Sequence, residues 1–171
     1  MRTSGGLRLG LGVAALVILF DQAAKWWIMA VVMQPPRIIP VTPFFNLVMG
    51  WNRGISFGLF DGDSAINVWI LPLVALAIVA ALVVWLRRVQ GVWLASAIGL
   101  VIGGALGNVV DRLRFGAVAD FLDFHVAGVH WPAFNVADSG ITVGVTMLVL
   151  DSLFMGAKKP KNKGGTEVKE G

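Results

Sequence analysis

Two aspartates in the second half of the chain have the residue type and the placement for proton-transfer chemistry. Asp120 and Asp138 lie on opposite arms of the connection between two apolar segments, so a hairpin in this connection would bring them together. Two carboxyl groups in contact do not both ionise easily, and such a pair can hold one proton. The sequence therefore predicts water activation by an aspartate pair near a membrane surface.

Further polar side chains accompany this pair within or at the ends of the apolar segments. Asn108 and Asp111 are three residues apart, and Asn135 precedes Asp138 by three residues. Residues at this spacing share one face of a helix. An ionisable residue within a membrane is costly and by default indicates a functional site. Arg112, which follows Asp111, offers a guanidinium group for bidentate binding of a carboxylate.

Asp21 and Lys25 form another polar pair, four residues apart in the first apolar segment. One interpretation is a mutual ion pair that makes both side chains tolerable in the membrane and has no further role. The other is that Lys25, about 6 Å further along the helix, reaches a polar centre shared with the third apolar segment or with a substrate. The sequence leaves both interpretations open.

The composition identifies the class of protein that must position these residues. Of the 171 residues, 57% are hydrophobic and only 14% are charged, and the mean hydropathy is +0.78. A soluble domain is far less apolar. The chain has no cysteine, which excludes disulfides, thiolate zinc ligands and thiol nucleophiles.

Four apolar stretches are long enough to cross a bilayer, which requires about 20 helical residues. They cover about residues 9–33, 66–86, 92–110 and 132–154. The fourth helix is expected to begin at Pro132, because proline is favoured in a first helical turn. The predicted fold is an all-α membrane protein with one domain over residues 1–157, followed by a basic, disordered tail over residues 158–171.

The connection between the first two helices is expected to hold a small β-containing element. Prolines break helical structure in the run IIPVTPFFNLVM at 38–49, whose β-branched residues suit short strands. The following segment combines a turn at Asn52, Arg53 and Gly54 with an apolar, aromatic run that could lie on the membrane surface. An ordinary structured loop is the alternative.

The basic residues predict the orientation of the helices. Nine lysines and arginines lie in the N-terminus, the second connection and the tail, whereas four lie in the first and third connections. The positive-inside rule then predicts cytoplasmic termini and extracytoplasmic first and third connections. This topology accounts for the sequence pI near 10.0, so nucleic acid is not an expected partner.

Small residues form a stripe along the third helix. Gly99, Gly103 and Gly107 recur at every fourth position. Such a stripe allows a neighbouring helix to approach closely, so we interpret it as a packing surface.

Three other chemistries are less well supported. Asp123, His125 and His130 could suggest zinc, but the spacing is not HExxH, and histidines at the membrane interface are the alternative. Ser96 and Ser139 have no evident base for a serine mechanism. An ion-coupled transporter is the main rival, because membrane-embedded Asp and Lys are also typical of transporters. Against it, the chain has no internal repeat, few helices, and acidic residues that collect near one face.

Five sequence blocks resemble the family of lipoprotein signal peptidases, also called signal peptidase II. They occur in the family's order, and the set is specific although no single block is. The blocks are FDQAAK (20–25), WNRGISFG (51–58), GGALGNVVDRL (103–113), GAVADF (116–121) and PAFNVADSGITVG (132–144).

The resemblance implies a multi-pass aspartic peptidase of the bacterial inner membrane, with its active site toward the periplasm and with membrane lipids around it. Its substrates would be lipid-modified prolipoproteins, cut just before the diacylglyceryl-modified cysteine, and it would require no metal or cofactor. The resemblance implies that Asp120 and Asp138 are the catalytic pair. The positions expected to support the site or bind substrate are Asp21, Lys25, Asn52, Arg53, Asn108, Asp111, Arg112 and Asn135. Ala119 departs slightly from the family, which usually has a β-branched residue there.

Overall fold

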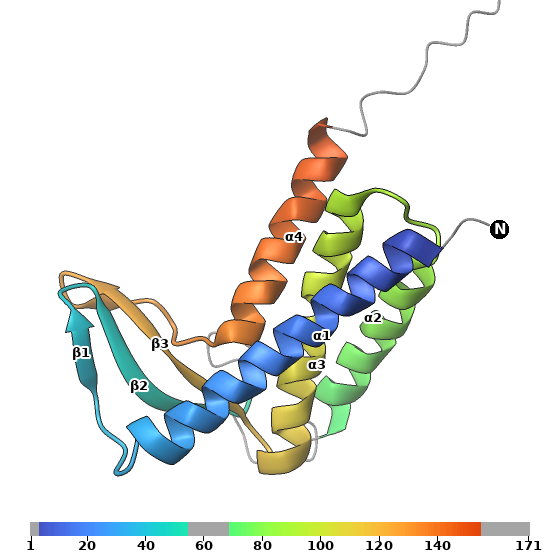
Figure 1. The fold of residues 1–171 in the computed structure, drawn as a ribbon. Coiled ribbons are helices and arrows are strands. Elements are labelled where there is room, and N and C mark those ends of the chain that lie inside the picture. Colours follow the sequence, from blue (N-terminus) through green and yellow to red (C-terminus); the bar gives the residue numbers. More distant parts are fainter. Residues whose placement is uncertain (1–3, 55–68, 155–171) are drawn as a thin grey trace, which may run out of the picture.

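Helices and one small antiparallel sheet make up the described part of the chain (Figure 1). The computed structural model describes residues 4–54 and 69–154. Predictions for the segment 55–68, including the apolar run after Gly54 and the start of the second helix, lie outside the described residues, as does the predicted tail. The elements are α1 (Ser4–Trp27), the π-helical turn η1 (Ile28–Val32), β1 (Ile39–Thr42), β2 (Phe45–Asn52), α2 (Leu71–Leu86), α3 (Val92–Phe115), β3 (Val118–Val126), β4 (Val129–His130) and α4 (Val136–Phe154).

Three of the helices are long and apolar enough to cross a membrane. These segments are Gly5–Val32, Val92–Phe115 and Val136–Phe154, whereas α2 is a shorter apolar helix of 16 residues. These three segments overlap the predicted stretches 9–33, 92–110 and 132–154, although their ends differ. The chain is therefore a mostly helical membrane protein with an added sheet.

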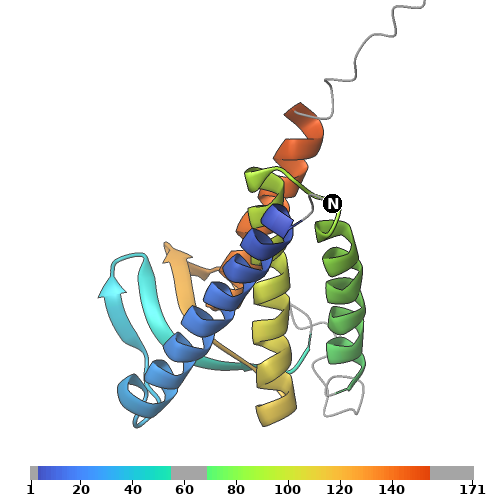
Figure 2. The ribbon, with the colours of Figure 1, turned by 45° about the vertical axis from the view of Figure 1, so that its right-hand side comes forward.

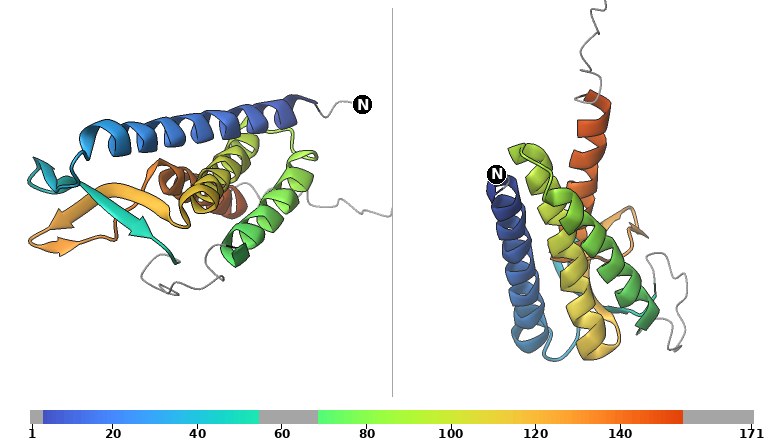
Figure 3. Two further views of the ribbon diagram at one scale, coloured as in Figure 1. Left: turned by 90° about the horizontal axis from the view of Figure 1, so that it is seen from below. Right: turned by 90° about the vertical axis from the view of Figure 1, so that its right-hand side faces the viewer.

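The long helix α3 occupies the centre of the helical part and packs against α1, α2 and α4 (Figure 3). Its glycines make this possible. A Cβ atom on Gly103 would lie 2.7 Å from the Ala14 carbonyl oxygen of α1, and one on Gly104 would overlap the Ala137 carbonyl of α4. The predicted role of the glycine stripe in packing is confirmed.

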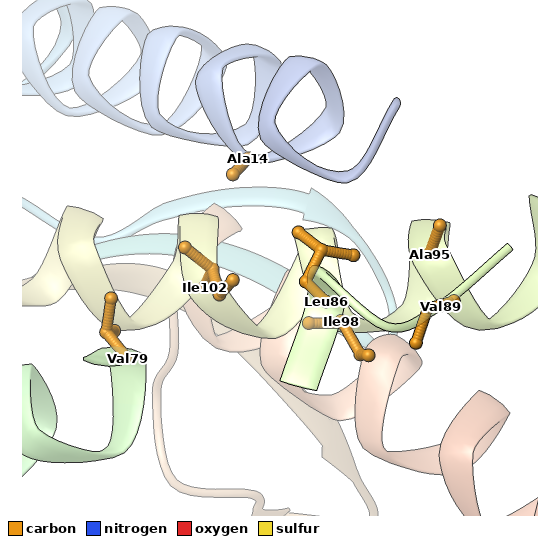
Figure 4. Packing of buried hydrophobic residues seen from close by; sticks show 7 residues of the cluster. All are labelled: Ala14, Val79, Leu86, Val89, Ala95, Ile98 and Ile102. Carbon is orange, nitrogen blue, oxygen red and sulfur yellow. The ribbon is translucent and has the colours of Figure 1, made fainter. Parts of the chain in front are cut away.

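An apolar cluster joins α1, α2 and α3 (Figure 4). In lipid, such packing stabilises a helix pair through van der Waals contact, because lipid tails are as apolar as the side chains. The cluster fixes α3 against its neighbours at the end distant from the sheet. Its buried members are Ala14, Val79, Leu86, Val89, Ala95, Ile98 and Ile102.

The sheet has four antiparallel strands in the order β1-β2-β3-β4. Strands β1 and β2 confirm the β-structure predicted between the first two helices. The sequence did not predict that β3 and β4, from the third connection, complete the same sheet. The run Val118–Phe121 is buried at every residue. The alternation of polar and apolar residues that indicates a strand arises in half-buried strands, so it is not expected in this run.

Strands β3 and β4 form a hairpin in the third connection, as expected if Asp120 and Asp138 are to come together. Its two-residue turn has positive φ at Ala127 (50°) and Gly128 (81°), as type I′ hairpin turns do. After β4 the chain runs back beside β3, where Phe134 pairs with Leu122 in an isolated bridge. The hairpin thus returns the chain toward Asp120 before α4 begins.

Two predicted helix boundaries near the aspartates are wrong. Helix α3 continues five residues past Val110 to Phe115 and ends at Gly116, whose φ of 72° is the left-handed conformation common at helix ends. Helix α4 begins at Val136 and not at Pro132. The bridge of Phe134 to β3 keeps the preceding residues extended, and Asp138 therefore lies in the first turn of α4.

Candidate active site

The two predicted aspartates are carried by different kinds of element. Asp120 lies on β3 and is 4% exposed, and Asp138 lies in the first turn of α4. The sheet lies on one side of α3, beside the start of α4 and the end of α1, whereas α2 lies on the other side (Figures 2 and 3). Strand β3, the start of α4 and the facing sides of α1 and α3 therefore supply the site.

One asparagine binds both carboxyl groups. The Asn135 side-chain nitrogen donates to Asp120 Oδ1 at 2.7 Å, and its backbone N–H donates to Asp138 Oδ2 at 3.3 Å. Asn108 of α3 donates to Asp138 Oδ1 at 2.7 Å and accepts a bond of 3.2 Å from the Asn135 side chain. The structure thus joins Asp120 and Asp138 through Asn135, and it adds Asn108, which the sequence had paired with Asp111, to the same group.

Asn135 also caps the N-terminus of α4, which begins at the next residue. Its Oδ1 accepts a hydrogen bond of 2.9 Å from the backbone N–H of Asp138, while Asp138 Oδ2 accepts the backbone N–H of Asn135. This reciprocal pair is a capping box with aspartate in place of the usual glutamate. The local sequence NVAD therefore starts the helix and orients the Asp138 carboxyl group at the same time.

Lys25 lies at the centre of a second, adjoining polar cluster. Its ammonium group is 2.8 Å from Asp21 Oδ2 and 2.8 Å from Asp111 Oδ2, and donates to Asn108 Oδ1 at 3.2 Å. Lys25, Asp21 and Asp111 are each at most 1% exposed. Both interpretations of the Asp21–Lys25 pair are therefore partly correct: the ion pair exists, and Lys25 also reaches α3.

The residues before the two candidate catalytic aspartates are tied to this second cluster. The backbone N–H of Ala119 donates to Asp111 Oδ2 at 3.1 Å, and that of Ala137 donates to Asp21 Oδ1 at 2.9 Å. Gly107 makes room for the latter arrangement, since a Cβ there would lie 2.7 Å from Asp21 Oδ2.

Gln22 is a member of the cluster that sequence reasoning missed. Its side-chain nitrogen lies within hydrogen-bond distance of Asp111 Oδ1 (2.9 Å), Asp21 Oδ2 (3.1 Å) and the Gly107 carbonyl oxygen (3.3 Å). Its signal was an uncharged amide next to Asp21 in an apolar helix. That signal is weaker than the one from the charged residues of the same helix.

Strand β2 and the end of α3 supply the remaining predicted residues. Asn52 hydrogen-bonds to Asp120 through its side chain. Among the described residues, Arg112 donates to the Gly54 carbonyl oxygen at 3.1 Å and not to a carboxylate in the bidentate manner predicted. Arg112 lies in the part of α3 beyond the predicted end of the helix, and from there it reaches the segment that follows β2. Arg53 directly follows β2 and is exposed.

The environment of Asp120 favours its protonated form. Burial raises the pKa of Asp120 to about 7, and the nearby Asp138 carboxyl group acts in the same direction. Hydrogen bonds from Asn52 and Asn135 oppose this rise. A carboxyl group with this pKa can exchange a proton near neutral pH, as a general acid or base must.

The histidines lie apart from the aspartate pair, on the outer part of the hairpin. His130 Nδ1 is 2.9 Å from both oxygens of Asp123, which also accepts a bond of 2.9 Å from Asn46. Burial alone would raise the pKa of Asp123, but the bonds from Asn46 and His130 hold it below its usual value. No group of three or more potential metal ligands occurs among the described residues.

The geometry can be compared with that of known proteins. The family model described as signal peptidase (SPase) II matches residues 13–154. The chain belongs to the signal peptidase II family. A lipoprotein signal peptidase of Methylorubrum extorquens (strain PA1) is 43% identical over 157 residues, which are 90% of each chain. One from Paraburkholderia phytofirmans is 48% identical over 88% of this chain and 87% of the relative.

Solved structures show the same architecture. A bacterial membrane enzyme solved at 2.3 Å resolution has a TM-score of 0.75 and 31% sequence identity, over 92% of this chain and 94% of the other. A second, solved at 1.9 Å, has a TM-score of 0.72 and 32% identity, over 85% and 92%. Sequence similarity and structural similarity therefore both support the family assignment.

Proposed function

We propose that Asp120 and Asp138 are the catalytic pair with which this chain cuts diacylglyceryl-modified prolipoproteins just before the lipidated cysteine. As a member of its family the chain is a lipoprotein signal peptidase, an aspartic peptidase that processes prolipoproteins. The observation that carries the proposal for the pair is the shared hydrogen bonding of both carboxyl groups to Asn135.

The reaction follows from one proton shared by two carboxyl groups. The ionised member takes a proton from water as the water oxygen attacks the scissile carbonyl carbon. The protonated member donates its proton to the carbonyl oxygen, which gives a tetrahedral diol. As the C–N bond breaks, the carboxyl group that took the proton from water gives it to the leaving nitrogen, and the diol returns a proton to the other carboxylate. Because the two groups titrate as a unit, neither role belongs permanently to one residue. The raised pKa of Asp120, about 7, supports a singly protonated pair at neutral pH. No metal or cofactor is needed.

The surrounding polar residues are proposed to support the pair and the substrate. Asn108 and Asn135 orient the carboxyl groups, and Asn52 adds a hydrogen bond to Asp120. Asp21, Lys25 and Asp111 hold the backbone beside the pair. Arg53 and Arg112 bring positive charge to the same end of the molecule, where the substrate backbone would lie.

We propose that the chain is a single domain over residues 1–157 that crosses the bacterial inner membrane four times, with both termini and the tail 158–171 in the cytoplasm. The sheet and the pair would then lie at the periplasmic face, among membrane lipids, where exported precursors present their lipidated cysteine. The basic residues, nine against four, support this orientation. The same distribution gives no reason to expect nucleic acid as a partner.

Replacement of each aspartate by asparagine tests the catalytic pair. With purified protein and a lipid-modified precursor, Asp120→Asn and Asp138→Asn should each lower the rate roughly 10³-fold or more, and the double variant should be no worse than either single one. Asp151→Asn, near the other end of α4, is the matched control and should keep full activity. Cleavage should also continue in the presence of EDTA. Appreciable turnover by either single variant would contradict the proposal.

A further inference from the structure

Each candidate catalytic aspartate follows a residue whose backbone is held by a buried carboxylate. Ala119, before Asp120, donates its N–H to Asp111, and Ala137, before Asp138, donates its N–H to Asp21. Asp21 and Asp111 lie on α1 and α3 and are both 0% exposed. Strand β3 is therefore anchored to α3 one residue before Asp120, and the start of α4 is anchored to α1 one residue before Asp138.

The two anchoring carboxylates are joined to each other in two ways. Lys25 binds Oδ2 of both at 2.8 Å. Gln22 binds Asp21 Oδ2 at 3.1 Å and Asp111 Oδ1 at 2.9 Å. The bond from Gln22 is the one contact that the described residues make to Asp111 Oδ1. A carboxylate held through one oxygen can rotate about its side-chain bond, whereas one held through both cannot.

Building on the proposed catalytic pair, we infer that Gln22 is a positioning residue that fixes the separation of Asp120 and Asp138. It bridges Asp21 and Asp111 and so holds the backbone before one aspartate against the backbone before the other. Within the described residues Gln22 makes no hydrogen bond to either member of the pair, so it acts through the two anchors. The ammonium group of Lys25 balances the charge of the Asp21 and Asp111 carboxylates. The amide of Gln22 adds a second hydrogen-bonding group that joins these two carboxylates and orients them.

The expected consequence is a loss of rate without a loss of substrate binding. A misplacement of about 1 Å at reacting groups can lower a rate by 10²-fold. Without the amide of Gln22, Asp111 can rotate, and the strand that carries Asp120 gains freedom relative to α4. We expect kcat to fall roughly 10- to 100-fold, with KM changed less than about twofold because no substrate contact is removed.

Gln22→Met tests this, because methionine keeps the length of the side chain and removes the amide. The measurements are kcat and KM for cleavage of a lipid-modified precursor by the full-length enzyme in detergent, normalised to the folded fraction from its thermal unfolding curve. Gln34→Met is the matched control. Among the residues that the structure describes, Gln34 donates to the Met29 carbonyl oxygen alone, at 2.8 Å, and its replacement should leave kcat and KM unchanged. An unchanged kcat for Gln22→Met, or a raised KM with normal kcat, would overturn the inference.

A second variant covers the case in which Gln22→Met does not fold. Gln22→Asn keeps the amide but shortens its reach by one methylene, so it should fold and still lose kcat. Full kcat in this variant would overturn the inference as well. Asp120→Asn, assayed in parallel, separates the two levels of the argument. If it is inactive while both Gln22 variants retain full kcat, only the positioning role fails, whereas an active Asp120→Asn removes the catalytic pair itself.

Discussion

Asp120 combines the two properties that an aspartic peptidase requires of one carboxyl group. It is buried enough to retain a proton near neutral pH, and it is bound by Asn135 and Asn52, which fix its orientation. Burial and the nearby Asp138 raise its pKa, and the two asparagines keep the ionised form accessible. A buried carboxyl group with a raised pKa lowers the stability of the fold when it ionises.

That cost predicts a pH-dependent difference in stability. The pKa of Asp120 is about 7 in the folded chain, against a usual value of 3.8. A raised pKa means that protonation of Asp120 favours the folded state, and this contribution is lost as the pH rises through about 7. Because asparagine cannot ionise, Asp120→Asn should raise the melting temperature relative to the parent more at pH 8 than at pH 5.

Thermal unfolding in detergent at the two pH values measures this difference. Groups away from the pair titrate equally in both proteins and cancel in the comparison, so the difference reports on the coupled pair of Asp120 and Asp138. A shift in melting temperature that is the same at pH 5 and pH 8 would show that the environment of Asp120 does not favour its proton.

At the residue scale, the most useful signal in the sequence was the energetic cost of placing charged residues in apolar helices. Asp21, Lys25, Asp111 and Asp138 lie in apolar helices, and charged residues there must find partners or a function. The structure brings all four into one connected network. Gln22 escaped prediction because an uncharged amide in an apolar helix is less costly, and its three acceptors come together only in the folded chain.

Helix packing positions the site through close contacts of backbone with backbone. Gly104 of α3 faces the carbonyl group of Ala137, the residue before Asp138. A side chain at Gly104 would therefore push the first turn of α4 away from α3, and with it Asp138 away from Asn108.

Gly104→Ala should therefore lower both the melting temperature and the cleavage rate. The added Cβ would overlap the Ala137 carbonyl, so the helices must separate. Gly12→Ala on α1 is the matched control, because nothing lies within 4 Å of the added atom. Alanine is favoured over glycine in a helix by about 1 kcal/mol, so the control should be at least as stable as the parent. Equal behaviour of the two variants in unfolding and cleavage assays would contradict this account of the α3–α4 contact.

At the element scale, the long apolar helices could be predicted and their ends near the site could not. Hydropathy gives the length of a span, but tertiary contacts determined where α4 begins. The bridge between Phe134 and Leu122 keeps the chain extended up to Asn135, and the capping box then starts the helix. Strand β3 was hidden by its complete burial around Asp120.

For the whole molecule, the decisive prediction is which face of the membrane carries the site. Val129, at the tip of the hairpin, is 75% exposed. Gly91 lies in the connection between α2 and α3, and a Cβ atom added there would meet nothing within 4 Å. Because the chain has no native cysteine, Val129→Cys and Gly91→Cys can each be labelled without background.

In intact spheroplasts, a membrane-impermeant maleimide should label Val129→Cys and should leave Gly91→Cys unlabelled until the cells are lysed. The expectation follows from the distribution of basic residues, which places the connection containing Arg87 and Arg88 in the cytoplasm. Both variants should be checked for cleavage activity, so that labelling reports on folded enzyme. Labelling of Gly91→Cys alone in intact cells would place the aspartate pair on the wrong face for exported precursors.

The position of Lys25 early in the chain has a consequence for the order of synthesis. Its partners Asn108 and Asp111 are made 83 and 86 residues later, and the contact of Asp21 with Ala137 joins residues 116 apart. Until the later helices have been made, Asp21, four residues before Lys25 on the same helix, is the counter-ion of Lys25. The ion pair that later holds the backbone beside the aspartates is therefore available within the first helix from the start of synthesis. Because the proposed pair includes Asp138 of α4, we expect cleavage activity only after the last helix has been inserted, and none from a chain truncated before α4.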